Sequence, residues 1–189
     1  MKTNLFSGIK LTLVFMILFM GLYSLLILSI AQLAPNQGKG FILSVHGNKQ
    51  YENIGQLFSH DAFFWSRPSA VNYNAAGSGG SNKGPSNPDY LATVQSRIDS
   101  FMVHNPGTQK TDIPSDLVTA SGSGEDPNIS VQGALVQVSR IARIRNCPEE
   151  KLMALVKAHI EKPLFGFLGP QKINVLKLNI ALDNEMKQE

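Results

Sequence analysis

The segment Leu11-Thr-Leu-Val-Phe-Met-Ile-Leu-Phe-Met-Gly-Leu-Tyr-Ser-Leu-Leu-Ile-Leu-Ser-Ile-Ala-Gln-Leu-Ala34 decides how this chain is organised, because its 24 residues carry no charge. Of these residues, 14 are Leu, Ile, Phe or Val. At about 1.5 Å per residue, a helix of this length is ~36 Å long and can cross a hydrocarbon core of about 30 Å with some tilt. Pro35 and Gly38 then end the helix. The segment predicts one transmembrane helix, residues 11–34.

A cleaved signal peptide is the alternative interpretation of this segment. The apolar region of a signal peptide has about 7–15 residues and is followed by a small-x-small cleavage site. The run here is longer, and Ala31-Gln-Leu-Ala34 does not provide such a site. We therefore expect an uncleaved anchor.

The charges that flank the helix predict its orientation. Lys2, Lys10 and the α-amine precede it, whereas Lys39 and Lys49 follow it. The positive-inside rule favours, by a small margin, an N-terminus in the cytoplasm and a domain outside. The expected layout is a short N-terminal segment (1–10), the transmembrane helix (11–34) and one soluble domain (35–189).

The composition of the soluble part excludes several classes of function. Two of the 17 Lys and Arg residues precede the helix, which leaves 15 against 14 Asp and Glu, a net charge of about +1. Without a basic stripe, nucleic-acid binding is not expected. Cys147 is the only cysteine and the four His residues are scattered, so we expect neither an intramolecular disulfide nor a metal site.

Periodic apolar residues predict helices and strands in the soluble domain. Asn87, Ser130 and Pro148 are typical of helix starts and precede three amphipathic segments. In the second of these, the face opposite the apolar one carries Arg140 and Arg143. Strands are expected at residues 41–45, 117–119 and 172–182, the last because Leu and Ile alternate with other residues. These elements predict an α/β or α+β domain.

Two segments rich in Gly and Ser are expected to be loops. Residues 72–89 read either as a flexible linker or as a structured loop whose glycines let a partner or an anion approach the backbone. In residues 121–127, backbone N–H groups and hydroxyls suit a phosphate, and Glu125 and Asp126 suit a cation; a capped turn is the alternative. No common nucleotide-binding or catalytic motif occurs, so the residues favour a binding or assembly module over an enzyme.

Several long segments, in one order along the chain, closely resemble a known family: the C subunit of the bacterial high-affinity potassium-transporting P-type ATPase, the Kdp system. The matching segments are Phe64-Trp-Ser-Arg-Pro-Ser-Ala70, Tyr73-Asn-Ala-Ala-Gly-Ser-Gly-Gly-Ser-Asn-Lys-Gly-Pro-Ser-Asn-Pro88, Asp116-Leu-Val-Thr-Ala-Ser-Gly-Ser-Gly-Glu-Asp-Pro-Asn-Ile-Ser130, Gly166-Phe-Leu-Gly169 and Asn174-Val-Leu-Lys-Leu-Asn179.

The resemblance implies a non-catalytic accessory subunit of a potassium-uptake pump in the bacterial inner membrane. Its partners would be a P-type ATPase subunit, a channel-like potassium-translocating subunit, a small single-helix subunit and the lipid bilayer. Potassium would be the transported ion, with no cofactor of the chain's own and ATP acting through the ATPase subunit. The family's role is described as a catalytic chaperone that raises the affinity of the ATPase subunit for ATP.

The resemblance also implies candidate sites. Ser121, Gly122, Ser123 and Gly124 would be the nucleotide-binding stretch. The candidate partner contacts are Gly21, Ser24 and Ser29 in the helix and Arg67, Gly79, Gly80, Ser81 and Asn82 in the domain.

Cytoplasmic ATP conflicts with an external domain, and this leaves two further functions open. One is a cap or gate over the outer mouth of the channel-like subunit, without nucleotide contact. The other is a cytoplasmic nucleotide-binding regulatory module.

Overall fold

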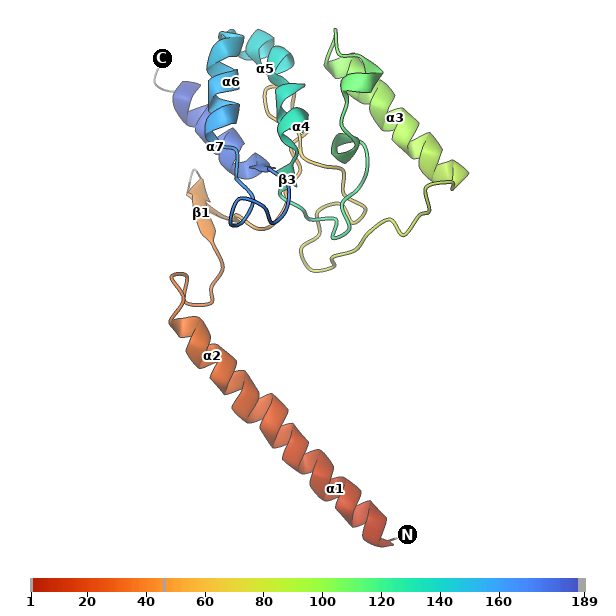
Figure 1. Ribbon diagram of the computed structural model, residues 1–189, viewed down its shortest axis with the longest axis vertical. Helices are drawn as coiled ribbons and strands as arrows, with labels where there is room; N and C mark the ends of the chain where they lie inside the picture. Colours follow the sequence, from red (N-terminus) through yellow and green to blue (C-terminus); the bar gives the residue numbers. More distant parts are fainter. Residues whose placement is uncertain (1, 46, 187–189) are drawn as a thin grey trace. The chain divides into compact units, whose positions relative to one another are not determined.

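The structure is a computed structural model that describes residues 2–45 and 47–186. Its contacts divide the chain into two compact units, Met1–Leu43 and Ser44–Glu189, each of which is described separately. Figure 1 shows the N-terminal helix in red and orange and the C-terminal helices in blue.

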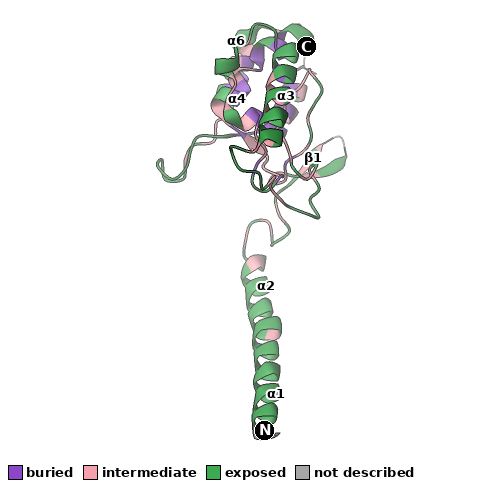
Figure 2. Cartoon of the chain, turned by 90° about the vertical axis from the view of Figure 1, so that its right-hand side faces the viewer, coloured by how far each residue is buried: buried purple, intermediate pink, exposed green. Residues whose placement is uncertain are grey.

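The first unit is built on one continuous apolar helix. It comprises α1 (Lys2–Met16), a π-helical stretch (Ile17–Tyr23) and α2 (Ser24–Gln32). Within it, Asn4–Gln32 is long and apolar enough to cross a membrane, and none of its most apolar window is buried inside the chain (Figure 2). Ser29 and Thr12 donate their hydroxyls to carbonyls four residues earlier, which satisfies these polar groups inside an apolar helix.

From residue 42 onward the chain mixes helices with two small sheets, so the expected fold class is confirmed. β1 pairs with β2, and β3 pairs antiparallel with β4, where Asn128 lies opposite Asn174 and Ile129 opposite Ile173. The elements in chain order are β1 (Ile42–Val45), β2 (Asn48–Tyr51), α3 (Pro88–His104), the 3₁₀ turns Lys110–Asp112 and Ser115–Leu117, β3 (Asn128–Ile129), α4 (Val131–Leu135), α5 (Val138–Arg145), α6 (Glu149–Ala158), β4 (Ile173–Asn174) and α7 (Val175–Met186).

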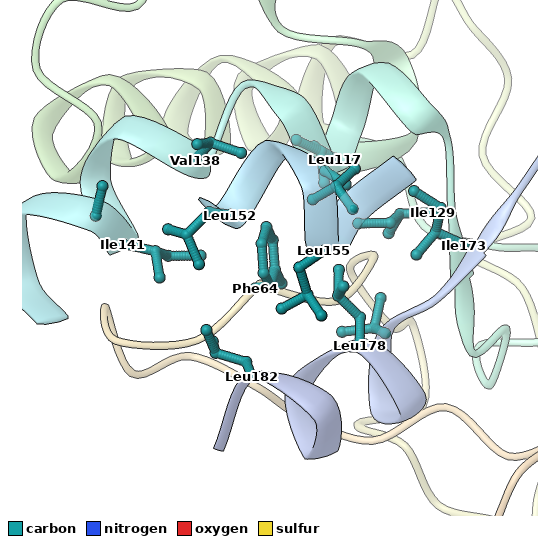
Figure 3. Packing of buried hydrophobic residues seen from close by; sticks show 14 of the residues in the cluster. Phe64, Leu117, Ile129, Val138, Ile141, Leu152, Leu155, Ile173, Leu178 and Leu182 are labelled. Atoms are coloured by element: carbon teal, nitrogen blue, oxygen red, sulfur yellow. The ribbon is translucent and has the colours of Figure 1, made fainter. Parts of the chain in front are cut away.

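The core of the second unit lies where α5, α6 and α7 surround Phe64, whose side chain is fully buried (Figure 3). Phe64 lies in a segment outside the helices and strands, and both of its backbone polar groups bond to the Asn179 side chain of α7 at 2.9 Å. The aromatic cluster at residues 63–65 is therefore part of the core. Other core members are Phe101, Ile141, Leu152, Val156, Ile173, Leu178 and Leu182.

The three predicted helix starts are confirmed. The Asn87 side chain accepts a hydrogen bond from the Tyr90 N–H, and the Ser130 side chain accepts one from the Gly133 N–H. Pro148 precedes α6, whose first turn carries Glu149 and Glu150. Each start follows from local chemistry. The Asn and Ser side chains accept hydrogen bonds from free N–H groups of the first turn, and Pro has no N–H that would need a partner.

Two predicted strands are wrong. Residues 172–182 form the two-residue strand β4 and then α7. Because Leu178 and Leu182 are four residues apart, the alternating pattern also fits one face of a helix. Residues 117–119 instead form the end of a 3₁₀ turn, Ser115–Leu117, and the two residues after it. The Ser115 carbonyl accepts hydrogen bonds from the N–H groups of Val118 (3.2 Å) and Thr119 (2.9 Å).

Candidate functional site

Two loops far apart in the sequence pack together and contain most of the predicted site residues. We call them the double loop, defined as residues 67–82 and 121–126. The Gly79 N–H donates to the Ser123 carbonyl (2.8 Å), and the Ser78 hydroxyl donates to the same oxygen (3.0 Å). The Ser121 N–H donates to the Pro68 carbonyl (3.4 Å). Residues 72–82 are therefore joined to the rest of the domain, as the structured-loop alternative expected.

Close backbone approach explains why glycine occupies two positions of the double loop. Gly124 has a φ of +73°, and a Cβ there would lie 2.5 Å from Val71 Cγ2 and 2.7 Å from the Gly79 carbonyl oxygen. A Cβ on Gly80 would lie 3.1 Å from the Gly122 carbonyl oxygen. By contrast, a Cβ on Gly122 would meet nothing within 4 Å.

Side-chain contacts hold the first segment of the double loop, residues 67–82, in place. Arg67 forms an ion pair with Asp126 at 2.9 Å, and the Tyr73 hydroxyl donates to the Arg67 carbonyl. The Ser69 hydroxyl accepts from the N–H groups of Val71 (3.1 Å) and Tyr73 (2.9 Å). Burial raises the pKa of Tyr73 and outweighs the opposing charge of Arg97.

The predicted nucleotide-binding stretch is partly used for this packing. Ser121 and Gly124 are buried, whereas Gly122 and Ser123 are exposed. The Gly124 N–H donates to the Ser121 carbonyl (3.3 Å), and the Glu125 N–H donates to the Ser123 hydroxyl (3.1 Å). These donors are committed within the loop, and the acids that follow repel a phosphate. Nucleotide binding at residues 121–124 stays a prediction.

The double loop also contains buried polar atoms without a hydrogen-bond partner in the described part of the chain. They are Arg67 Nε, Ser121 Oγ and Glu125 Oε1. Of the predicted partner contacts here, Gly79, Gly80 and Ser81 are half-buried and Asn82 is exposed with a φ of +52°. Their role as partner contacts stays a prediction.

The predicted helix contacts lie in or near the π-helical stretch. Gly21 is inside it, and a Cβ there would meet nothing within 4 Å. Ser24 follows it and donates its hydroxyl to the Phe19 carbonyl at 3.2 Å, five residues back. Small residues on an apolar helix let another helix approach closely, which is the basis of this prediction.

Arg140 was expected on the face opposite the apolar one, but the residue is buried in the domain, with only 2% of it exposed. Its guanidinium donates to Asn105 Oδ1 (3.0 Å), Gln137 Oε1 (2.6 Å) and the Phe63 carbonyl (3.0 Å), and lies 4.5 Å from the centre of the Trp65 ring. These partners compensate for the burial of its charge. Periodicity could not locate most of them, because Asn105, Phe63 and Trp65 come from other segments of the chain.

An acid at the surface completes the Arg140 cluster. The Asp61 carboxylate lies 3.3 Å from Arg140 Nη1 and 2.9 Å from His104 Nδ1. Burial lowers the pKa of Arg140 to about 10, although Asp61 opposes this shift, so Arg140 is charged at neutral pH. Burial raises the pKa of Asp61, but the hydrogen bonds and charges of His104 and Arg140 outweigh it, and the pKa lies below 3.8.

Among the described residues, no group of three or more His, Cys, Asp or Glu is placed to hold a metal ion. Both clusters, the double loop and the Arg140 cluster, join distant segments of the domain through hydrogen bonds. The arrangement suits a rigid binding module.

Comparison with known proteins gives a consistent result. The family model described as "K+-transporting ATPase, c chain" matches residues 5–184. The potassium-transporting ATPase KdpC subunit of Flavobacterium johnsoniae is 58% identical over 181 residues, covering 95% of this chain and 97% of the relative. The protein of that name from Flavobacterium psychrophilum is 56% identical with the same coverage, and that from Bacteroides thetaiotaomicron is 49% identical over 187 residues, 97% of this chain and 98% of the relative.

Proposed function

Because this chain belongs to the KdpC family of potassium-transporting ATPase subunits, we propose that it supports the pump from outside the membrane, as a cap over the channel-like subunit. Membership makes it an accessory subunit of a potassium pump rather than the catalytic one. In the proposal, the helix of residues 11–34 crosses the inner membrane, and the domain of residues 35–189 lies on the outer side. The P-type ATPase, channel-like and single-helix subunits are its partners.

The apolar helix is the observation that carries the membrane part of this proposal. Its large side chains are exposed along the whole length within this chain, so something else has to cover them. Lipid and partner helices are the natural covering for a run of this length. Gly21, Ser24 and Ser29 are then available for close contact with another subunit's helix.

The packing of the double loop favours the cap over direct nucleotide contact. The N–H groups of Ser121, Gly124 and Glu125 already donate within the domain. A catalytic-chaperone effect on ATP turnover would then act at a distance, through stabilisation of the complex. A cytoplasmic nucleotide-binding module remains the alternative, with Gly122 and Ser123 as its exposed residues.

A growth assay tests the proposed function. A strain without this gene should fail to grow at very low potassium and should recover when the full chain is supplied. Normal growth of the deletion strain would contradict the proposal.

A double variant, Gly122→Ala with Ser123→Ala, separates the cap from nucleotide contact. Both positions are exposed, a Cβ on Gly122 meets nothing, and Ser123→Ala removes only the exposed hydrogen bond from the Glu125 N–H, so the fold should persist. The cap predicts that the assembled pump reaches half-maximal ATPase activity at an unchanged ATP concentration. A rise of tenfold or more, with the complex still intact, would favour the nucleotide-binding alternative.

A further inference from the structure

The connection between α6 and α7 presents a concentrated apolar surface. Leu164, Phe165, Phe167 and Leu168 lie within five residues, and their exposed fractions are 64%, 80%, 75% and 50%. We call residues 163–169 the apolar hairpin; it belongs to the blue part of the chain between α6 and α7 in Figure 1. Clustered exposure of this kind is unlike the scattered apolar residues of an ordinary surface and marks an interaction site.

The backbone holds the apolar hairpin in one shape. Glu161 and Lys172 exchange two hydrogen bonds at its base (2.8 and 3.2 Å), and Leu164 and Leu168 exchange two near the tip (3.2 and 2.9 Å). At the tip, Phe165 has a φ of +54°, in the left-handed region that bulky residues rarely adopt. Strain of this kind concentrates at functional positions. A surface ordered in advance loses little conformational entropy on binding.

We propose that the apolar hairpin inserts into an apolar pocket on the extramembranous surface of another subunit of the pump. This inference rests on the proposed function, since it requires a complex in which the domain meets other subunits. Within that complex, Phe165 and Phe167 are the anchoring side chains. Aromatic anchors in a charge-depleted patch are typical of the energetic centre of a protein interface.

The charges around the apolar hairpin favour a protein over a lipid surface. Residues 163–171 carry no charge. At the base, Lys172 lies 3.6 Å from Glu161, and Lys177 is paired with both Glu52 and Glu161. Three lysines lie at the base (Lys162, Lys172 and Lys177), and the two acids Glu52 and Glu161 offset two of their charges. The net charge at the base is therefore about +1. A loop that binds anionic lipid needs several unpaired cations, each contributing about 1 kcal/mol near the surface.

A second copy of this chain is a poorer partner than another subunit. Stable interfaces bury about 800 Å² on each side and involve roughly 20–30 residues. The hairpin is too small to hold a homodimer alone, but it fits as an anchor within a larger contact. The relatives of this chain are named as subunits of a potassium-transporting ATPase, so other chains are present to supply that contact.

Photo-crosslinking in the assembled pump tests the inference. Benzoylphenylalanine at position 165 or 167 of the full chain, irradiated in native membranes, should form a covalent adduct with another pump subunit, identified by mass. The same group at Val103, which is 77% exposed on α3, is the matched control and should not form that adduct. An adduct with phospholipid or with a second copy overturns the inference. So does the absence of an adduct while the subunits still co-purify, and this last result leaves the proposed function standing.

Substitution provides an independent readout. Phe165→Asn with Phe167→Ser should reduce recovery of this chain with a tagged partner subunit at least tenfold, because truncating such an anchor weakens binding by this order. Asn suits the left-handed backbone at position 165. Val103→Ser should leave recovery unchanged, and the thermal unfolding midpoint of all variants should match that of the parent chain. Unchanged recovery of the hairpin variant overturns the inference.

Discussion

Arg140 is the residue on which most of the polar core depends. Its side chain is fully buried and joins Asn105, Gln137 and the Phe63 carbonyl. Arg140→Ala leaves Asn105 Oδ1 and the Phe63 carbonyl without this donor, whereas Gln137 Oε1 keeps its hydrogen bond from the Trp65 N–H (2.7 Å). We expect the free energy of unfolding to fall by about 3–5 kcal/mol. Unfolding is followed through the fluorescence of Trp65, the only tryptophan. Arg143→Ala, on the exposed side of α5, should change stability by less than about 0.5 kcal/mol; equal losses would contradict the burial of Arg140.

Asp61 should make stability depend on pH at the acid end. Its pKa is lower in the folded chain than the 3.8 of the free side chain. The stabilisation that the Asp61 carboxylate provides is therefore complete when the pH is above the pKa of Asp61 in the unfolded chain. It is lost as the pH falls through the pKa of Asp61 in the folded chain. In urea unfolding, Asp61→Asn should have a lower free energy of unfolding than the parent chain at pH 6, and this difference should shrink towards pH 3. Asp99→Asn is the exposed control, and a difference that grows on acidification would contradict this account.

At the scale of elements, sequence reasoning succeeded where local chemistry decides the structure. Asn87, Ser130 and Pro148 start helices through contacts within one turn, so their position could be predicted. Sequence reasoning failed at α7, because its alternating Leu and Ile residues fit both the two-residue period of a strand and the 3.6-residue period of a helix. The partners of Arg140 and the packing of Gly124 on Val71 are long-range, and no local pattern encodes them. For the double loop, the sequence indicated two segments rich in Gly and Ser, but not that these segments pack against each other.

Two truncations distinguish a helix from a strand at α7. In a strand, Leu178 and Ile180 would share a face and cost the same when truncated. In α7, Leu178 is fully buried and Ile180 is half-buried. Leu178→Ala should lower the free energy of unfolding by about 2–5 kcal/mol, and Ile180→Ala by clearly less. Chemical denaturation measures the free energy of unfolding of both variants. Equal losses would contradict the helix and support a strand.

At the scale of the whole molecule, the domain should fold without the helix. Every member of its core cluster lies at or beyond residue 58, so no core residue comes from the first unit. We expect a fragment of residues 35–189 to unfold cooperatively within a few degrees of the full chain, as followed by Trp65 fluorescence. A fragment that is unfolded or has a much lower midpoint would show that the proposed domain boundary is wrong.

In the proposed function, the domain lies outside the membrane and the N-terminus lies in the cytoplasm. Labelling of intact spheroplasts with an impermeant maleimide tests it most directly. Cys147 is half-buried, so it is replaced by Ala, and single cysteines are placed at the exposed Ser86 in the domain and Ser7 before residues 11–34. We expect Ser86→Cys to be labelled in intact spheroplasts and Ser7→Cys to be labelled only after lysis. Labelling of Ser86→Cys only after lysis would contradict it and place the domain beside cytoplasmic ATP.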